Sequence, residues 1–205
     1  MDKTFINQKL NQLAELNYSG TSENPLDSVD NSIKFFIETQ SVVDDLIDNL
    51  FNDNGEAYRT ASLKCNNKNE LFEWLNNIAE KQGMLIYPVS EYKYKNSQVN
   101  YYLGTDEGWN CNTVGFILVD IKQVKHHYGF SSKADIVNIL DYLLTSYTDY
   151  MNGNVYRVNT YQLNSNEKKE KMIGCFDGIL SMDANIEYLL SVDLLDGEFR
   201  DWKEE

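Results

Sequence analysis

The sequence predicts an α+β fold, in which a small, mostly antiparallel sheet is covered by helices and preceded by an N-terminal helical region. The longest apolar run, residues 114–119, is too short for a helix. It is rich in β-branched and aromatic residues, which indicates a strand buried on both faces. Other segments repeat apolar residues at helical spacing, and no Gly-rich phosphate loop follows a predicted strand.

Helical apolar spacing predicts six helices, at residues 4–16, 28 to about 53, 69–83, 122–128, 132–153 and from 183 onward. The fifth opens with a capping box, because Ser132 is followed three residues later by Asp135. Strands are expected at residues 84–89, 99–103, 114–119, 155–163 and 172–176. Pro88 places the first of these strands at a sheet edge or close to its own end.

The predicted elements divide at Gly83 into two regions. Residues 1–83 are expected to form an acidic, helical N-terminal region, and residues 84–205 an α+β module with an acidic C-terminal tail. Since 42% of the 205 residues are apolar, the chain can bury a sizeable core.

The formal charge of −14 and the isoelectric point near 4.5 argue against nucleic acid or an anionic membrane as the main partner. Nucleic-acid phosphates and anionic membranes would repel this chain at long range, so a basic protein is the expected partner. The sequence has no secretory signal and no apolar run near the ~20 residues that span a bilayer, which predicts a cytoplasmic protein. The three cysteines, Cys65, Cys111 and Cys175, are far apart and predict reduced, buried thiols.

Nearly all the excess negative charge lies in two segments. Residues 27–56 hold eight acids against one lysine, and residues 175–205 hold nine acids against two bases, a net charge of −7 in each. Residues 57–174 are nearly neutral. A single helix from 28 to about 53 would place the first set of acids on one face, with Asp30 and Asp48 roughly 27 Å apart.

Carboxylates spaced in this way can occupy the basic groove of a nucleic-acid-binding protein in place of phosphates. The residues expected at such a contact come from both acidic segments: Asp27, Asp30, Glu38, Asp45, Asp48, Glu198, Asp201, Trp202 and Glu204. Two simpler interpretations stay open. The acids can be solvated helix faces, and Trp202 or Phe199 can dock the tail onto the protein's own core.

No residue pattern predicts catalysis, a metal site or a cofactor, so the chain is expected not to be an enzyme. His126 and His127 are the only histidines, and neighbouring residues on a helix point about 100° apart, which disfavours a shared metal ion. Cys175 lies near Asp177 but lacks a positioned base, which favours an inert thiol over a nucleophile.

Five short motifs occur, once each, in the second half of the chain: PVSEY at 88–92, WNCNTVGFILV at 109–119, KQVKHHYG at 122–129, DYMNGNVY at 149–156 and GCFDG at 174–178. Together, over residues 88–177, they resemble a family of uncharacterised proteins carried by phages, plasmids and conjugative elements of Gram-positive bacteria. That family usually has W-D-S-G-x-V-G-F in the second motif and Y-L-N-G-x-V-Y-G in the fourth. This chain departs at residues 110–112, at Arg157, and at Cys175 and Phe176, where a late tryptophan is usual.

The resemblance implies a protein of a mobile element, and accessory proteins of such elements often antagonise restriction or CRISPR systems. With the charge pattern, it predicts an anti-CRISPR or antirestriction inhibitor that acts as a nucleic-acid mimic. Its target would be the basic groove of a host defence nuclease, either a type II CRISPR effector or a restriction complex. The alternative is a non-enzymatic interaction or regulatory protein that binds through the neutral middle module, around Trp109 and Tyr156. Neither hypothesis involves direct contact with nucleic acid or a membrane.

Overall fold

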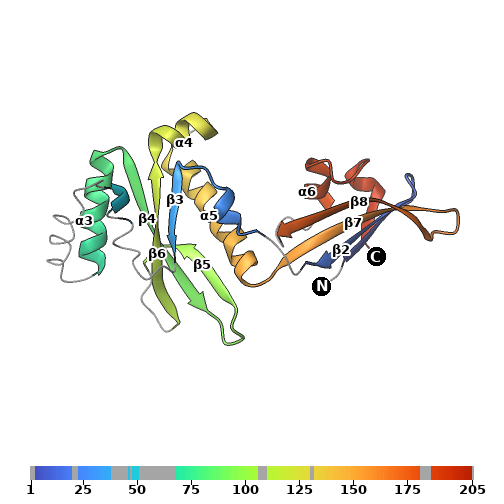
Figure 1. The fold of residues 1–205 in the computed structure, drawn as a ribbon, viewed down its shortest axis with the longest axis horizontal. Coiled ribbons are helices and arrows are strands. Elements are labelled where there is room, and N and C mark those ends of the chain that lie inside the picture. Colours follow the sequence, from blue (N-terminus) through green and yellow to red (C-terminus); the bar gives the residue numbers. More distant parts are fainter. Residues whose placement is uncertain are drawn as a thin grey trace. The chain divides into compact units, whose positions relative to one another are not determined.

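The computed structural model describes residues 3–19, 23–37, 46, 48–50, 68–105, 110–129, 132–180 and 186–204. The chain folds into two compact units. The central unit is residues 25–148, and the terminal unit joins residues 1–24 to residues 149–205. Each unit contains an antiparallel sheet and helices (Figure 1), which confirms the predicted α+β class and gives two sheets where one was expected.

The central unit is built on a four-stranded antiparallel sheet with the order β3-β6-β4-β5. Its strands are β3 (Ile33–Ile37), β4 (Met84–Lys93), β5 (Val99–Leu103) and β6 (Cys111–Asp120). β6 contains the longest apolar run and lies between β3 and β4, and its Ile117 and Val119 are fully buried. The prediction of an inner, buried strand is therefore confirmed.

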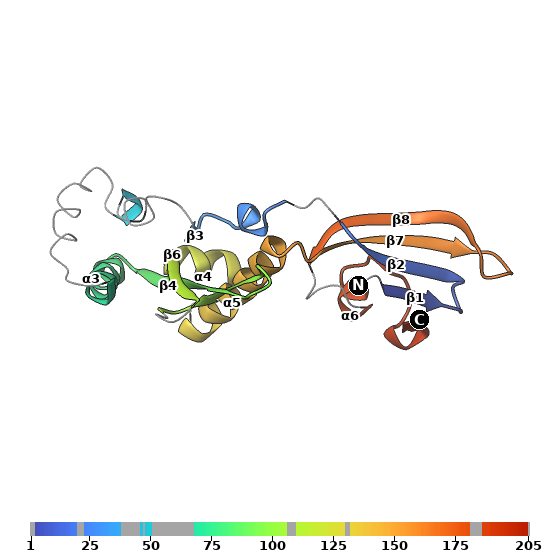
Figure 2. The same cartoon turned by 90° about the horizontal axis from the view of Figure 1, so that it is seen from below.

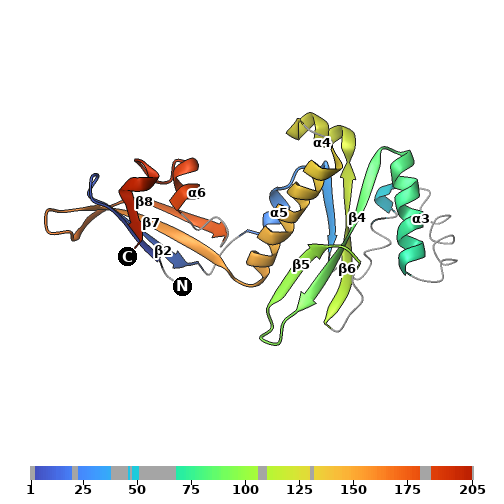
Figure 3. The same cartoon turned by 180° about the vertical axis from the view of Figure 1, so that it is seen from behind.

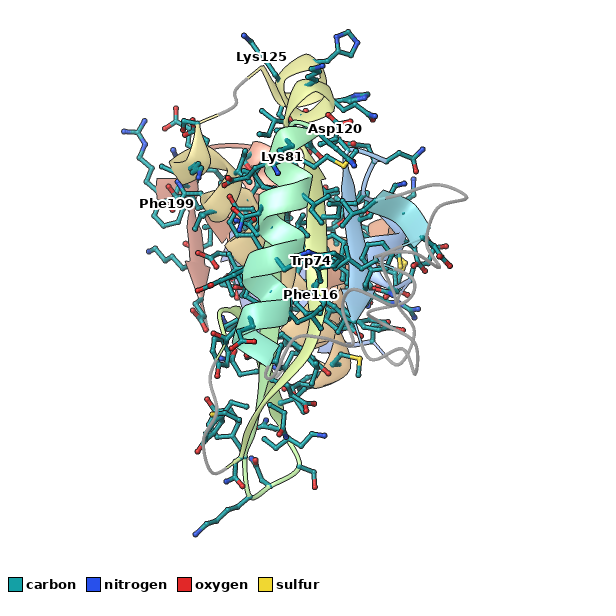
Figure 4. All side chains as sticks on the ribbon, turned by 90° about the vertical axis from the view of Figure 1, so that its left-hand side faces the viewer. Trp74, Lys81, Phe116, Asp120, Lys125 and Phe199 are labelled. Carbon is teal, nitrogen blue, oxygen red and sulfur yellow. The ribbon has the colours of Figure 1, made fainter. Side chains whose placement is uncertain are left out.

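Helices lie on both sides of this sheet (Figures 1 and 3). α3 (Lys68–Lys81) lies on one side, where Trp74 and Phe116 of β6 belong to one apolar cluster (Figure 4). α5 (Lys133–Met151) lies on the other side and buries Ile136, Leu140 and Leu144. Within the described residues, no helix is both long and apolar enough to cross a bilayer.

The capping box predicted at Ser132 is confirmed, and the structure adds a second cap at Asp120. The carboxylate of Asp120 accepts hydrogen bonds from two backbone N–H groups in the first turn of α4 (Ile121–Tyr128), at 2.9 and 3.1 Å, and so caps that helix. At the start of α5, the Ser132 hydroxyl accepts a hydrogen bond from the N–H of Asp135 at 3.1 Å, as the capping box predicts. The expected start of the last helix, near residue 183, lies outside the described residues.

The terminal unit is built on a five-stranded antiparallel sheet with the order β8-β7-β2-β1-β9. Its strands are β1 (Lys3–Asn7), β2 (Gln12–Tyr18), β7 (Val155–Leu163), β8 (Lys169–Leu180) and β9 (Trp202–Glu204). One face is covered by α6 (Ile186–Ser191) and the segment after it, which includes a 3-10 helix, η3 (Phe199–Asp201) (Figure 2). The core under this cover is one cluster: Phe5, Ala14, Leu16, Tyr156, Val158, Ile179, Leu189, Leu195 and Trp202.

The predicted helix at residues 4–16 is wrong, because this segment forms the β1–β2 hairpin. Asn11 adopts the left-handed conformation at φ 50°, and the Asn7 side chain accepts a hydrogen bond from the N–H of Leu10 at 3.2 Å. Asparagine tolerates that conformation better than most residues, so the chain reverses there. Pairing with β7 and β9 then buries alternate residues of the two strands.

The predicted helix from 28 to about 53 is also wrong as a single element. A 3-10 helix, η1 (Pro25–Ser28), is followed by strand β3, which pairs with β6 at the edge of the central sheet. β3 consists largely of β-branched and aromatic residues, which favour a strand once β6 offers a partner. Leu46 and residues 48–50 are helical, and the rest of this predicted helix lies outside the described residues.

The domain boundary expected at Gly83 falls inside the central unit, and residues 1–83 do not form a helical region of their own. Gly83 lies in the turn between α3 and β4, and α3 packs on the sheet that β4 enters. The two ends of the chain belong to the other unit, because β9 pairs with β1 and β7 pairs with β2. Strand pairing between segments that are distant in the sequence therefore determines how the chain divides into two units.

Pro88 lies within β4, an inner strand, whereas an edge or a strand end was expected. Its carbonyl accepts a hydrogen bond from the N–H of Gly104 at 2.9 Å, and the pairing of β4 with β5 begins only at Val89. Since the nitrogen and carbonyl of one residue point to the same side of an antiparallel strand, the Pro88 nitrogen faces the end of β5. No sheet hydrogen bond is lost there.

Candidate interaction surface

The first acidic segment does not form one charged helix face. Asp27 lies in η1 and Asp48 lies beyond β3, both exposed, and the strand between them breaks the helical spacing. Successive side chains of a strand point to opposite faces, so the expected row of carboxylates along one helix is wrong. Glu38 and Asp45 lie outside the described residues.

Asp30 is engaged within the central unit. Its carboxylate accepts a hydrogen bond from the N–H of Ser32 at 2.6 Å and interacts with the hydroxyl of Tyr128 at the end of α4. Burial acts most strongly and raises the pKa of Asp30, but Ser32, Tyr128 and the nearby His127 together outweigh it, so that pKa is lowered. Burial, the hydrogen bond to Asp30 and its negative charge raise the pKa of Tyr128 to about 12.

Two of the C-terminal residues expected at the contact have structural roles. Trp202 is 6% exposed and packs in the core of the terminal unit, so docking of the tail by this tryptophan is the correct interpretation. Asp201 forms an ion pair with Lys9 at 2.5 Å, and this hydrogen bond raises the pKa of Lys9. Phe199, by contrast, is 62% exposed and lies on the surface.

Glu198 and Glu204 are exposed, as a contact surface requires. Glu204 lies on β9, opposite Phe5 of β1. Glu198 forms an ion pair with Arg200 at 2.6 Å, and both side chains are largely exposed. Exposed pairs of this kind contribute only about 0.2–1 kcal/mol, so Glu198 can exchange Arg200 for a base on another protein at little cost.

An acidic surface does exist on the terminal unit, in α6 and the turn that follows it. We call it the α6 surface, and its members are the exposed residues Glu187, Val192, Asp193, Asp196, Glu198 and Phe199. Arg200 is the only base between residues 186 and 200. The sequence predicts an acidic tail here, but it gives no reason to prefer Asp193 and Asp196, whose only signal is the pattern D-L-L-D at 193–196.

A groove with a volume of about 210 Å³ lies between β8 and the turn after α6. We call it the β8 groove, and the residues that line it are Gln12, Thr160, Ile173, Gly174, Phe176, Asp193, Leu194, Leu195 and Asp196. Ile173 and Phe176 are 45% and 36% exposed, which is high for large apolar side chains. The groove therefore combines exposed apolar side chains with polar groups, among them two carboxylates from the α6 surface.

Glycine at position 174 gives the floor of the groove its shape. A Cβ atom there would lie 2.7 Å from the Thr160 hydroxyl oxygen and 3.1 Å from the ring of Phe176. The Phe176 ring thus lies against the backbone of Gly174, an arrangement that compensates a strand glycine for its missing side chain. Asp193 is placed by the end of α6, where it adopts the left-handed conformation at φ 56°.

The groups considered for other chemistry do not converge. The rings of His126 and His127 are 5.4 Å apart and nearly perpendicular. Nowhere in the described ranges do three His, Cys, Asp or Glu side chains come together in a way that could hold a metal ion. Cys111 is half-buried, but Cys175 is exposed, so the expectation of buried thiols is wrong for Cys175. Cys65 lies outside the described residues.

Of the two residues around which the neutral middle module was expected to bind, the structure describes one, and it is buried. Tyr156 is 9% exposed, and its ring stacks on that of Tyr18 with centroids 4.8 Å apart. Trp109 lies outside the described residues.

Fold and surface together define an α+β protein of two units, with an acidic, partly apolar surface on the terminal unit. Comparisons with protein-family models, with curated proteins and with solved structures give no match.

Proposed function

We propose that this chain is a non-enzymatic binding protein that engages a basic partner protein through the α6 surface. The observation that carries this proposal is that four exposed carboxylates and two exposed apolar side chains lie in one short segment, with Arg200 as its only base. Apolar anchors supply affinity, while carboxylates that keep their charge steer a basic partner and fix its register. The net charge of −14 adds to that steering.

The class of partner comes from the motif resemblance. A protein of a mobile element with this charge fits an inhibitor of a host defence nuclease, either a type II CRISPR effector or a restriction complex. The carboxylates of the α6 surface would occupy its basic groove in place of phosphates. This proposal transfers the contact from the row once expected at residues 27–48 to Glu187, Asp193, Asp196 and Glu198.

The proposal is tested by capture from a Gram-positive bacterial lysate on the tagged full-length chain, at rising salt and with added duplex DNA. The expected result is a captured nucleic-acid-binding protein that is lost at high salt and displaced by DNA, because the contact is electrostatic and uses the DNA groove. The double variant Glu187→Lys with Asp196→Lys is expected to capture nothing.

A matched control is the double variant Glu73→Lys with Asp141→Lys. These two residues are exposed on α3 and α5 of the central unit, and their reversal changes the net charge by the same amount. The control is expected to capture the partner as the parent chain does. A partner that stays bound in high salt, in excess DNA and on the α6 variant would contradict the proposed function.

A further inference from the structure

We infer that the β8 groove receives one arginine side chain of the basic partner. This inference rests on the proposed function and adds the chemistry of its central contact. Pockets for small molecules usually have volumes of about 300–1,000 Å³. The volume of the β8 groove, about 210 Å³, suits a single protein side chain better than a whole ligand.

The walls of the groove match the two parts of an arginine side chain. Ile173 and Leu194 provide apolar surface for the methylene stem, which long basic side chains bury while their charged end stays in contact with polar groups. Phe176 is exposed enough to offer its ring to a planar guanidinium, which stacks on aromatic rings more readily than an ammonium does. A lysine would use the stem contacts but not the stacking.

The negative charge at the rim of the groove matches the positive charge of the guanidinium. Asp193 and Asp196 both line the groove, and both are exposed. Two bases of the terminal unit are paired with other acids, Arg200 with Glu198 and Lys9 with Asp201, and no ion pair within the described residues involves Asp193 or Asp196. The two carboxylates are therefore accessible to a guanidinium, whose forked donors can serve two acceptors at once.

The rim is also held in place before any partner arrives. The N–H of Leu194 donates to the carbonyl of Leu189 at 2.9 Å, which fixes the turn that presents Asp193. The carbonyl of Asp196 accepts the indole N–H of Trp202 at 2.9 Å. A preorganised site loses less conformational freedom on binding, which favours affinity.

The test is a titration of the isotope-labelled full-length chain, followed by NMR, with the capped peptide Ala-Ala-Arg-Ala-Ala. Saturable shifts in the amide signals of Ile173, Gly174 and Asp196 are expected. The same peptide with citrulline, which is nearly isosteric with arginine but neutral, is expected to give none, and the lysine peptide weaker binding. Absence of shifts with the arginine peptide, or equal binding of the citrulline peptide, would overturn the inference.

Two variants keep the test independent of folding. Asp193→Asn with Asp196→Asn removes both charges, and asparagine tolerates the left-handed conformation of position 193. Affinity for the arginine peptide is expected to fall about tenfold. Ile173→Ser, at an exposed position, is expected to weaken binding as well, whereas the control Glu73→Gln with Asp141→Asn leaves it unchanged.

The failures of the inference and of the proposed function are distinguishable. If Ile173→Ser loses the peptide but captures the lysate partner as before, the inference is overturned and the proposed function stands. If the arginine peptide binds in the groove but the chain captures no basic protein, the proposed function is overturned.

Discussion

The indole N–H of Trp202 donates a hydrogen bond to the carbonyl oxygen of Asp196, with 2.9 Å between the nitrogen and the oxygen. Trp202 is buried on β9, whereas the carboxylate of Asp196 lies at the rim of the β8 groove. The bond therefore couples the core of the terminal unit to its acidic surface. Trp202 positions that surface from below and does not itself meet a partner.

Replacing Trp202 should separate its packing in the core from its hydrogen bond to Asp196. Trp202→Phe retains an aromatic ring but loses the hydrogen bond, and we expect the free energy of unfolding to fall by about 0.5–1.5 kcal/mol. Trp202→Ala also leaves a cavity and should cost about 3–5 kcal/mol. Urea denaturation followed by circular dichroism measures both changes.

The Phe variant should also bind the arginine peptide more weakly, since the Asp196 carbonyl loses its anchor. Phe199→Ala is the control for stability, because Phe199 is 62% exposed, and a change within about 0.5 kcal/mol is expected. Wild-type stability and wild-type peptide affinity of Trp202→Phe would show that the hydrogen bond has no role.

Gly115 in β6 allows a close approach of two strands. A Cβ atom at this position would overlap the carbonyl oxygen of Phe36 and lie 2.8 Å from the Cα atom of Ile37, both in β3. Backbone atoms cannot move aside as a flexible side chain can, so Gly115→Ala should push β3 away from β6. We expect a lower urea midpoint and a loss of more than about 2 kcal/mol in the free energy of unfolding.

Gly153→Ala is the matched comparison for that variant. Gly153 has a φ of 71°, and no atom lies within 4 Å of a Cβ built on it, so only backbone strain of about 1–2 kcal/mol is expected. A smaller loss for Gly115→Ala than for Gly153→Ala would mean that β3 accommodates the methyl group. β3 would then not be held closely against β6.

Local sequence signals predict the central unit better than the terminal unit. A few neighbouring residues are enough to predict two elements of the central unit: the apolar run predicts strand β6, and the cap at Ser132 predicts the start of α5. The apolar residues of positions 3–18 fit both a helix and a hairpin. Only pairing with β7 and β9, which lie more than a hundred residues later in the chain, selects the hairpin.

The same limit applies to the candidate surface. The acidic character of the tail is readable from the sequence, but the availability of each carboxylate depends on partners far away in the chain. Asp201 is occupied by Lys9, and Asp30 by Tyr128, whereas Asp193 and Asp196 form no ion pair with any base in the described part of the chain. Neither the ion pair nor the groove beside β8 has a sequence signal, because strand pairing brings those segments together.

The Asp30–Tyr128 contact should give the central unit a measurable pH dependence. Asp30 has a lowered pKa, so its stabilising effect is present above its ordinary pKa of 3.8 and is lost as the pH falls through the lowered value. Tyr128 has a raised pKa, so its effect is present below pH 10 and is lost as the pH rises from 10 to about 12.

Asp30→Asn removes the negative charge that faces Tyr128, and the pKa of Tyr128 should fall from about 12 toward the ordinary 10. It should stay above 10, because burial is the largest cause of the shift and is unchanged. NMR titration of ring-labelled tyrosine measures this, with Tyr128→Phe to assign the signal. An unchanged tyrosine titration in Asp30→Asn would disprove the contact.

Cys175 offers a probe of which face of the terminal sheet is the binding face. Gly174, Cys175 and Phe176 pair with β7 in regular register, and successive side chains of a regular strand point to opposite faces. Gly174 and Phe176 line the β8 groove, so Cys175 points away from it. Ile173 lines the groove as well, because the register with β7 shifts between Met172 and Gly174 and interrupts the alternation there. No described helix lies on that opposite face (Figure 2). In a Cys65→Ser background, a maleimide should react faster with exposed Cys175 than with half-buried Cys111.

A bulky label at Cys175 should leave the arginine peptide and the lysate partner bound, because it lies on the side of the sheet that the contact does not use. The same label at position 173, introduced by Ile173→Cys together with Cys175→Ser, should block both, since Ile173 forms a wall of the groove. The two labelled chains differ by only two positions on one strand, so effects on folding and charge are matched. If the label at Cys175 blocks binding and the label at 173 does not, the partner occupies the opposite face of the sheet.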